Sequence, residues 1–146
     1  MTGPLESTHL PNRFRRARLC DVAQVNARSL PSTTDPGYAF RYVDIGSVSA
    51  FGEIDDLQLV TFADAPSRAR RVVQVGDIIV STVRTYLRAI ARVRDAEDVI
   101  ASTGFAVVTP SSAINPDYLY WWLCGHPFVE QIVSESVGVS YPAINA

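Results

Sequence analysis

The chain has 146 residues, of which 47% are hydrophobic and 19% are charged, a composition typical of a soluble globular domain rather than of a disordered segment. Its apolar stretches are only a few residues long, whereas a membrane-spanning helix needs about 20 apolar residues in succession. The polar N-terminus also lacks the apolar segment of a secretion signal. We therefore expect a cytoplasmic protein with a flexible leader over residues 1–12 and a single domain over residues 13–146.

Charge is distributed unevenly along the chain. The formal net charge is −2, all 13 basic residues are arginine, and lysine is absent. Residues 63–94 contain seven arginines and two acidic residues, whereas residues 95–146 contain six acidic residues and no arginine. The guanidinium group of arginine matches phosphate groups and the O6/N7 edge of guanine. The central basic block therefore indicates either a nucleic-acid surface or a merely solvated one.

The first half of the chain predicts short strands separated by loops. An apolar element at 19–25 is either a strand or one helical turn, and a loop rich in Pro, Ser and Thr follows at 29–37. Residues 38–45 and 57–62 are rich in β-branched, aromatic and other apolar residues and predict strands. The passage between them, 46–56, is rich in turn-forming residues.

The middle of the chain predicts one helical turn and further strands. Pro66 is suited to the start of a helical turn that extends to Arg71. The β-branched run at 78–83 predicts a buried strand. Residues 87–93 alternate between an apolar face and a largely arginine face, which predicts a half-buried strand. The last strand region, 99–109, is interrupted by small polar residues at 102–104.

Two helices are predicted near the C-terminus. Asn115 is a suitable N-cap and Pro116 a suitable first helical residue, and Gly125 can end the helix. Pro127 opens the second helix. The apolar stripe of the first helix consists of Tyr118, Leu119, Trp122 and Leu123. Strands followed by two helices predict an α+β fold, with a mixed or antiparallel twisted sheet of about five to eight short strands.

The sequence contains no recognisable catalytic or metal site. Cys20 and Cys124 are isolated, and neither His9 nor His126 has a partner at metal-ligand spacing. Residues 115–118 (Asn-Pro-Asp-Tyr) are close to the Asn-Pro-Pro-Tyr motif of amino-methyltransferases. Helix capping accounts for these residues, and no glycine-rich loop for S-adenosylmethionine precedes them. We expect a non-catalytic chain with no cofactor and no metal.

Several short motifs together resemble one known family. In order and spacing, five blocks are similar to the target recognition domains of type I restriction–modification specificity subunits. These blocks are Tyr42–Val48, Ser67–Arg71, Gly76–Arg84, Ala101–Val107 and Gly138–Asn145. They cover most of the chain from Arg18 to its end.

The resemblance implies a module that reads one half-site of a bipartite double-stranded DNA target. In such systems the specificity subunit binds two methyltransferase (M) subunits, which methylate adenine with S-adenosylmethionine. A translocating restriction (R) subunit completes the complex. A homodimer is an open alternative. The long spacer helix that follows this domain in the family is not expected in this sequence, and its absence puts both docking to the methyltransferase and unaided dimerisation through the helices in doubt.

Candidate DNA-contacting residues come from the arginine block and from the small polar motifs. Short hydroxyls and arginines at strand ends can bind phosphates or base edges. From the arginine block and the strand ends these are Arg68, Arg70, Arg71, Ser81, Thr82, Arg84, Tyr86 and Arg88. In the terminal motif they are Ser140, Tyr141 and Asn145, although Tyr141 is equally suited to packing the tail onto the core. Sequence choice is expected in the loops at 29–37 and 49–56.

Two other functions are compatible with the same sequence. The arginine block would also suit a protein-docking scaffold, with the acidic C-terminal third as the complementary surface of a head-to-tail pair. A methyltransferase fragment resting on residues 115–118 is the third hypothesis. A steep salt dependence of duplex binding favours DNA recognition, self-association without DNA affinity favours docking, and binding of S-adenosylmethionine favours the methyltransferase fragment.

Overall fold

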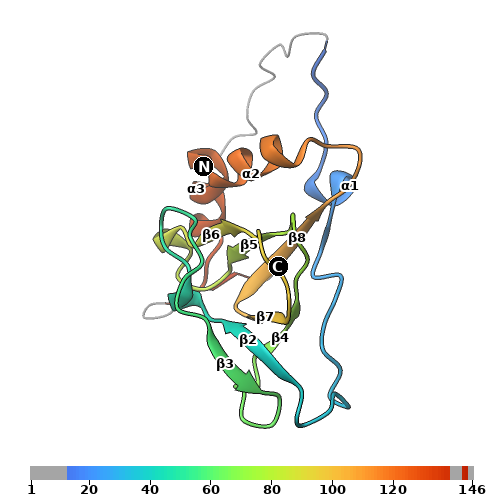
Figure 1. Cartoon of the computed structure of the whole chain (residues 1–146). Coiled ribbons are helices and arrows are strands. Elements are labelled where there is room, and N and C mark those ends of the chain that lie inside the picture. Colours follow the sequence, from blue (N-terminus) through green and yellow to red (C-terminus); the bar gives the residue numbers. More distant parts are fainter. Residues whose placement is uncertain (1–12, 139–142, 145–146) are drawn as a thin grey trace.

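The computed structural model describes residues 13–138 and 143–144, and within them eight strands form two sheets of four strands each (Figure 1). The strands are β1 (Ala23–Val25), β2 (Ala39–Val43), β3 (Gln58–Thr61), β4 (Ala69–Val72), β5 (Ile78–Ser81), β6 (Ile90–Arg92), β7 (Val99–Ser102) and β8 (Phe105–Pro110). The helices are α1 (Leu19–Val22), α2 (Pro116–Cys124), α3 (His126–Ser134) and the 3-10 turns η1 (Ile45–Ser47) and η2 (Thr85–Leu87).

The chain passes repeatedly between the two sheets. Sheet A has the order β1-β8-β5-β6 and is antiparallel throughout. Sheet B has the order β3-β2-β7-β4, with β2 parallel to β7 and the other pairs antiparallel. Strand β7 belongs to sheet B and β8 to sheet A, so the short turn at 102–104 carries the backbone from one sheet to the other.

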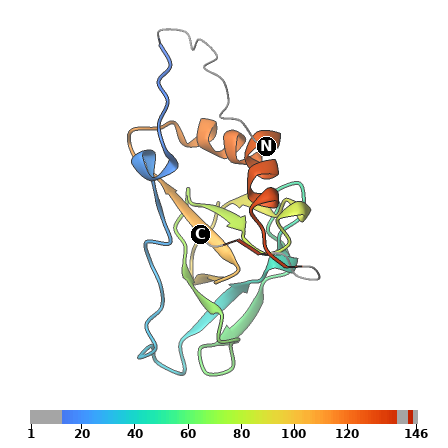
Figure 2. The same cartoon turned by 180° about the vertical axis from the view of Figure 1, so that it is seen from behind.

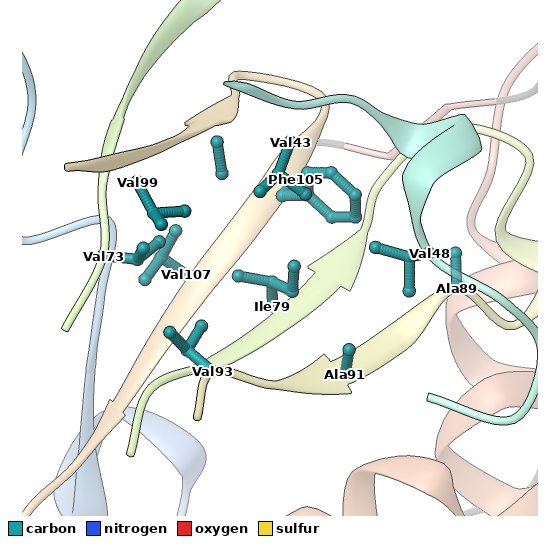
Figure 3. Packing of buried hydrophobic residues seen from close by; sticks show 11 residues of the cluster. Val43, Val48, Val73, Ile79, Ala89, Ala91, Val93, Val99, Phe105 and Val107 are labelled. Atoms are coloured by element: carbon teal, nitrogen blue, oxygen red, sulfur yellow. The ribbon is translucent and has the colours of Figure 1, made fainter. Parts of the chain in front are cut away.

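The main core lies between the two sheets. Figure 3 shows Val43 and Val99 of sheet B pointing toward Ile79, Phe105 and Val107 of sheet A. Phe105 is completely buried and Ile79 is 1% exposed. Each large apolar side chain buried in this way stabilises the fold by roughly 1.5–3 kcal/mol. The contact between the sheets therefore fixes the positions of the loops at their edges.

Each sheet also buries its outer face. Ile78, Val80 and Val108 of sheet A pack against Leu119 and Leu123 of α2, with further residues of α3. Figure 2 shows from behind that α2 and α3 lie on the side of sheet A that faces away from sheet B. On sheet B, the outer cluster of Phe40, Tyr42, Ala69 and Ile100 is covered by Leu30, Tyr38 and Phe62.

Much of the predicted architecture is confirmed. The chain is α+β, with the expected short strands and two C-terminal helices, although the strands divide into two sheets rather than one. The ambiguous element at 19–25 contains both α1 and β1. Asn115 caps α2, because its Oδ1 accepts the backbone N–H groups of Asp117 and Tyr118 at 2.8 and 3.1 Å. This cap accounts for the resemblance of residues 115–118 to a methyltransferase motif.

Two predictions of local structure, a helical turn and a strand, were wrong in detail. The helical turn expected at 66–71 ends after one hydrogen bond, from Ala69 N–H to the carbonyl of Pro66 at 2.8 Å. From Ala69 onward the chain joins sheet B as β4, since pairing with β7 outweighs the local preference. The alternating strand expected at 87–93 is only β6, because the backbone at Arg88 is left-handed, with φ 55°.

The predicted apolar stripe of α2 is only half buried. Leu119 and Leu123 are buried, whereas Tyr118 is 57% and Trp122 46% exposed.

Among the described residues, no helix is long and apolar enough to cross a membrane. The leader at 1–12 lies outside the described residues.

Candidate nucleic-acid interface

All five family-like motifs contribute residues to one end of the two sheets, which we call the motif end. It consists of residues 44–47, 67–68, 81–84, 102–104 and 143–144. The turn at 102–104 is its centre. Thr103 N–H donates to the carbonyl of Arg68 at 2.7 Å, and both the N–H and the hydroxyl of Thr82 donate to the carbonyl of Gly104, at 2.8 and 2.9 Å. Segments far apart in the sequence are thus joined through one turn.

The fifth motif reaches the same end of the molecule. Ile144 N–H donates to the carbonyl of Thr82 at 2.9 Å, and Ala143 forms bridges with Val83 and Val137. The candidate residues Ser140, Tyr141 and Asn145 lie outside the described residues. The parts of the terminal motif that the structure describes therefore place it beside the strand end that carries Ser81 and Thr82.

The loop between β5 and β6 holds two arginines in a rare backbone conformation. Arg84 and Arg88 have φ values of 49° and 55° and flank η2. A left-handed conformation costs a residue other than glycine roughly 1–2 kcal/mol, and such strain is concentrated at functional sites. Thr85 is buried and its Oγ1 lies 2.9 Å from Ser136 Oγ, which ties the turn to α3. Tyr86 is 52% exposed.

Arg88 and Arg84 differ in their surroundings. Arg88 is exposed, and its Nη2 lies 3.1 Å from Nδ1 of His126. His126 in turn lies 3.0 Å from Glu130, through Nε2. Arg84 is half-buried at the motif end. The turn thus presents one arginine outward and one partly enclosed arginine on either side of Tyr86.

Arg68 is held in place at the motif end by two acceptors. Its Nε donates to Tyr42 Oη at 3.2 Å and its Nη2 to Asp44 Oδ2 at 3.1 Å. The bond to Tyr42 and the charge of Asp44 raise the pKa of Arg68 above its ordinary value. The Arg68 side chain is 57% exposed, so the guanidinium is oriented and remains accessible.

The other candidates from the basic block have different environments. Arg70 stacks over Phe62 at 4.6 Å, and its Nη1 donates to the carbonyl of Ala69. Arg71 lies in β4 with its Nε buried. Ser81 is 3% exposed and its Oγ donates to the carbonyl of Val83 at 2.6 Å. The structure therefore brings Arg68, Ser81, Thr82 and Arg84 together and leaves Arg70 outside this group.

A groove of about 740 Å³ lies between the loop at 51–57, the end of β6 and α2. Phe51 and Trp121 line it and are 90% and 70% exposed. Its charged lining is balanced, with Arg41, Arg92, Arg94, Glu53, Asp55 and Asp95. The loop at 49–56 was a candidate for sequence choice, but neither aromatic residue was singled out, since nothing in the local pattern distinguishes an exposed Trp or Phe from a core residue.

The described part of the chain contains no cluster of three or more His, Cys, Asp or Glu side chains suited to a metal.

No protein-family model and no curated protein matches the chain. Solved structures do match. The HsdS subunit from Thermoanaerobacter tengcongensis is 36% identical over 93% of this chain, with a TM-score of 0.77. A chain from a study of complex assembly and conformational transition of the type I R-M system is 31% identical over 89% of this chain, with a TM-score of 0.69.

The chain belongs to the HsdS family. Its two sheets and its two C-terminal helices match the target recognition domain of an HsdS specificity subunit in type I restriction–modification. The chain spans about a third of the length of each of these two relatives, 36% in both cases. The motif end is thus the part of an HsdS target recognition domain at which the family-like blocks meet.

Proposed function

We propose that this HsdS domain reads one half-site of a bipartite double-stranded DNA target. The observation that carries the proposal is the gathering of three arginines, from two segments far apart in sequence, around the motif end and the adjoining β5–β6 loop. Arg68 is the last residue before β4, and Arg84 and Arg88 flank η2. Arginine binds phosphate oxygens and the guanine edge through paired donors, so this set supports both positioning and base reading.

The local geometry supports different roles for the candidates. Arg68 is already oriented by Tyr42 and Asp44, which reduces the entropy that would be lost on binding. Arg88 and Tyr86 are exposed and suited to direct contact. The hydroxyls of Ser81 and Thr82 are bonded within the protein, so we propose that these two residues support the loop. For Ser140, Tyr141 and Asn145 we retain the proposal of DNA contact.

The proposal includes the assembly in which the domain works. HsdS specificity subunits are generally non-catalytic, and we propose that this domain uses no cofactor and contributes no reacting group. We propose that a specificity subunit carrying it presents DNA to methyltransferase and restriction subunits. We also retain the division of the chain into a leader at 1–12 and one domain at 13–146.

The proposal is tested by selection from a randomised duplex library with the purified chain, at low salt and near physiological salt. A short enriched motif of a few base pairs is expected. Binding should weaken as salt rises, because the release of counterions from the DNA is then less favourable. An enriched repeat with fixed spacing would add that the chain dimerises on DNA. Absence of duplex binding at both salts would contradict the proposal.

Protein docking is the second candidate function, and one surface favours it. Helix α2 exposes Tyr118, Trp121 and Trp122, by 57%, 70% and 46%. Aromatic residues and arginine are enriched at protein interfaces, so this face suits a protein partner or a second copy of the chain. Sedimentation without DNA distinguishes the two: a mass that rises with protein concentration, together with no duplex affinity, would favour docking.

A further inference from the structure

We propose that Phe51 is a wedge that enters the base stack of the bound duplex, an inference that rests on the proposed function. Phe51 is 90% exposed, the highest exposure of any large apolar side chain in the described part of the chain. Moving a phenyl ring out of water lowers its free energy. A solvated ring on an ordered loop therefore favours contact with a binding partner. Proteins that kink DNA insert such apolar wedges between base steps.

The loop holds Phe51 rigidly while leaving its ring in solvent. Ser49 Oγ accepts the backbone N–H groups of Phe51 and Glu53, both at 3.2 Å. The backbone of Ser49 adds two more bonds, accepting from Gly52 at 3.1 Å and donating to Glu53 at 2.9 Å. A side chain presented by a preorganised loop loses little conformational freedom on binding, which is the property a wedge needs.

Gly52 allows the loop to pack closely against α2 and β6. Its φ is +78°, and a Cβ at this position would lie 2.5 Å from Tyr120 Oη and 3.0 Å from the carbonyl of Ile90. Only glycine fits such a close approach with this backbone conformation. The backbone beside Phe51 is therefore packed against α2 and β6, which fixes the place from which the loop presents the ring.

The Phe51 loop lies beside the arginine-bearing β5–β6 loop. Val48, just before the Phe51 loop, and Ala89, at the end of the β5–β6 loop, pack in the same buried cluster. Gly52 also approaches the backbone carbonyl of Ile90, the first residue of β6. Figures 1 and 2 both show the loop around residue 50 next to η2. Tyr86 lies between Arg84 and Arg88, and Phe51 lines a groove that also contains Arg41, Arg92 and Arg94. Both exposed rings therefore occur with arginine, the combination that suits bases flanked by phosphates.

The charge of the loop decides which part of the duplex it approaches. Glu53, Asp55 and Asp56 are exposed, and carboxylates are repelled by phosphates. Within a groove, however, a carboxylate can accept a hydrogen bond from the N4 amino group of cytosine. The acidic flank therefore favours a loop tip directed at base pairs, with the backbone contacts left to the arginines of the neighbouring loop.

The test uses duplexes that carry the selected half-site with 2-aminopurine placed at each position in turn. Binding of the native chain is expected to raise the fluorescence at one or two adjacent positions, because the wedge unstacks that step. Phe51→Ala should lose this rise and weaken binding by about tenfold, the order found for lost base–aromatic stacking. Phe51→Trp should retain the rise. Leu59→Ala, which removes another exposed apolar side chain from β3, is the matched control and should behave like the native chain.

Each other outcome counts against the wedge in a distinguishable way. An unchanged fluorescence rise and affinity in Phe51→Ala would overturn the wedge and leave DNA recognition standing. Absence of duplex binding by the native chain would overturn both proposals. If Phe51→Ala instead abolishes self-association in sedimentation and leaves DNA binding unchanged, the ring docks on protein and the wedge is overturned. Circular dichroism of each variant confirms that the fold is retained, since Phe51 contributes almost no buried surface.

Discussion

Asp77 and Arg28 form a buried ion pair that connects the loop after β1 to the start of β5. Asp77 Oδ2 lies 2.5 Å from Arg28 Nη2, and the Asp77 side chain is only 2% exposed. The same carboxylate accepts from Thr109 Oγ1 and from the backbone N–H of Gln74, both at 2.8 Å. Three segments of the chain therefore depend on one carboxylate.

Loss of that carboxylate should destabilise the domain strongly. Asp77→Ala removes the charged partner of the half-buried Arg28 guanidinium, which retains only its hydrogen bond to Thr109 Oγ1, and breaking a buried pair costs about 3–5 kcal/mol. Urea denaturation measures the free energy of unfolding. Asp95→Ala is the control, because Asp95 is exposed and its ion pair with Arg41 should contribute much less to stability. Equal losses in the two variants would contradict the structural importance of Asp77.

The Arg88→Gly variant separates the contribution of Arg88 to DNA binding from its contribution to folding. Because φ at this position is 55°, Arg88→Gly relieves backbone strain and should leave stability unchanged or raise it by up to about 1 kcal/mol. If Arg88 contacts a phosphate, all sequences bind more weakly and the slope of log K against log salt falls by about 1. If it reads guanine, the loss is roughly 1–3 kcal/mol at one base pair.

Arg84 also has a left-handed backbone, with φ 49°, so the Arg84→Gly variant is measured and interpreted in the same way. The measurements are duplex affinity over a range of salt and the melting temperature of each variant. Unchanged DNA affinity in both variants would refute their assignment to the interface. A loss of stability larger than about 1 kcal/mol, beyond the extra entropy that glycine gives the unfolded chain, would instead identify a structural arginine.

Gly52→Ala should destabilise the domain, whereas Gly46→Ala should not. The new methyl group at Gly52 would meet Tyr120 Oη at 2.5 Å and would sit on a backbone with φ +78°. Left-handed strain alone costs roughly 1–2 kcal/mol. Around Gly46 a Cβ finds no atom within 4 Å, so the change should stay within about 0.5 kcal/mol. Thermal denaturation compares them, and similar melting temperatures for both variants would show that the Gly52 contact is unimportant.

The two cysteines should differ in their reactivity. Cys20 is exposed, whereas Cys124 is half-buried, and burial raises the pKa of the Cys124 thiol. Because the thiolate is the reactive form, Cys124 has less of it at a given pH and should react more slowly with a thiol reagent near pH 8. Its rate should increase as the pH rises. Cys20→Ser is expected to leave only the slow phase, and both phases should merge in denaturant; a fast phase in Cys20→Ser would contradict the assignment.

Local signals predicted most elements of the fold. The N-cap at Asn115 and the β-branched run at 78–83 each depend on residues adjacent in sequence, and both predictions are confirmed. Ala69–Val72 could not be assigned from its own residues, because its strand conformation comes from pairing with β7, about thirty positions away. The left-handed backbone at Arg88 was equally hidden, since no turn residue marks it.

The candidate interface was predictable as a set of residues but not as a surface. Arg68 and Arg70 are neighbours in sequence, yet one lies at the motif end and the other over Phe62. The contact between Arg68 and Thr103 depends on the pairing of β4 with β7 in sheet B, which spacing along the chain does not reveal. Exposure is equally non-local: Phe51 and Phe105 are the same residue type, 90% and 0% exposed.

The turn at 102–104 has a consequence for how this domain changes over time. It links the two sheets through continuous backbone and also holds the ends of β4 and β5, so substitutions there would disturb the whole framework. The loop at 49–56 is anchored by the hydrogen bonds of Ser47 and Ser49, by the close approach at Gly52 and by Ile54, whereas Phe51, Glu53, Asp55 and Asp56 are exposed. On the proposed function, a lineage can therefore acquire a new DNA preference by exchanging loop residues, while its partners continue to meet an unaltered scaffold.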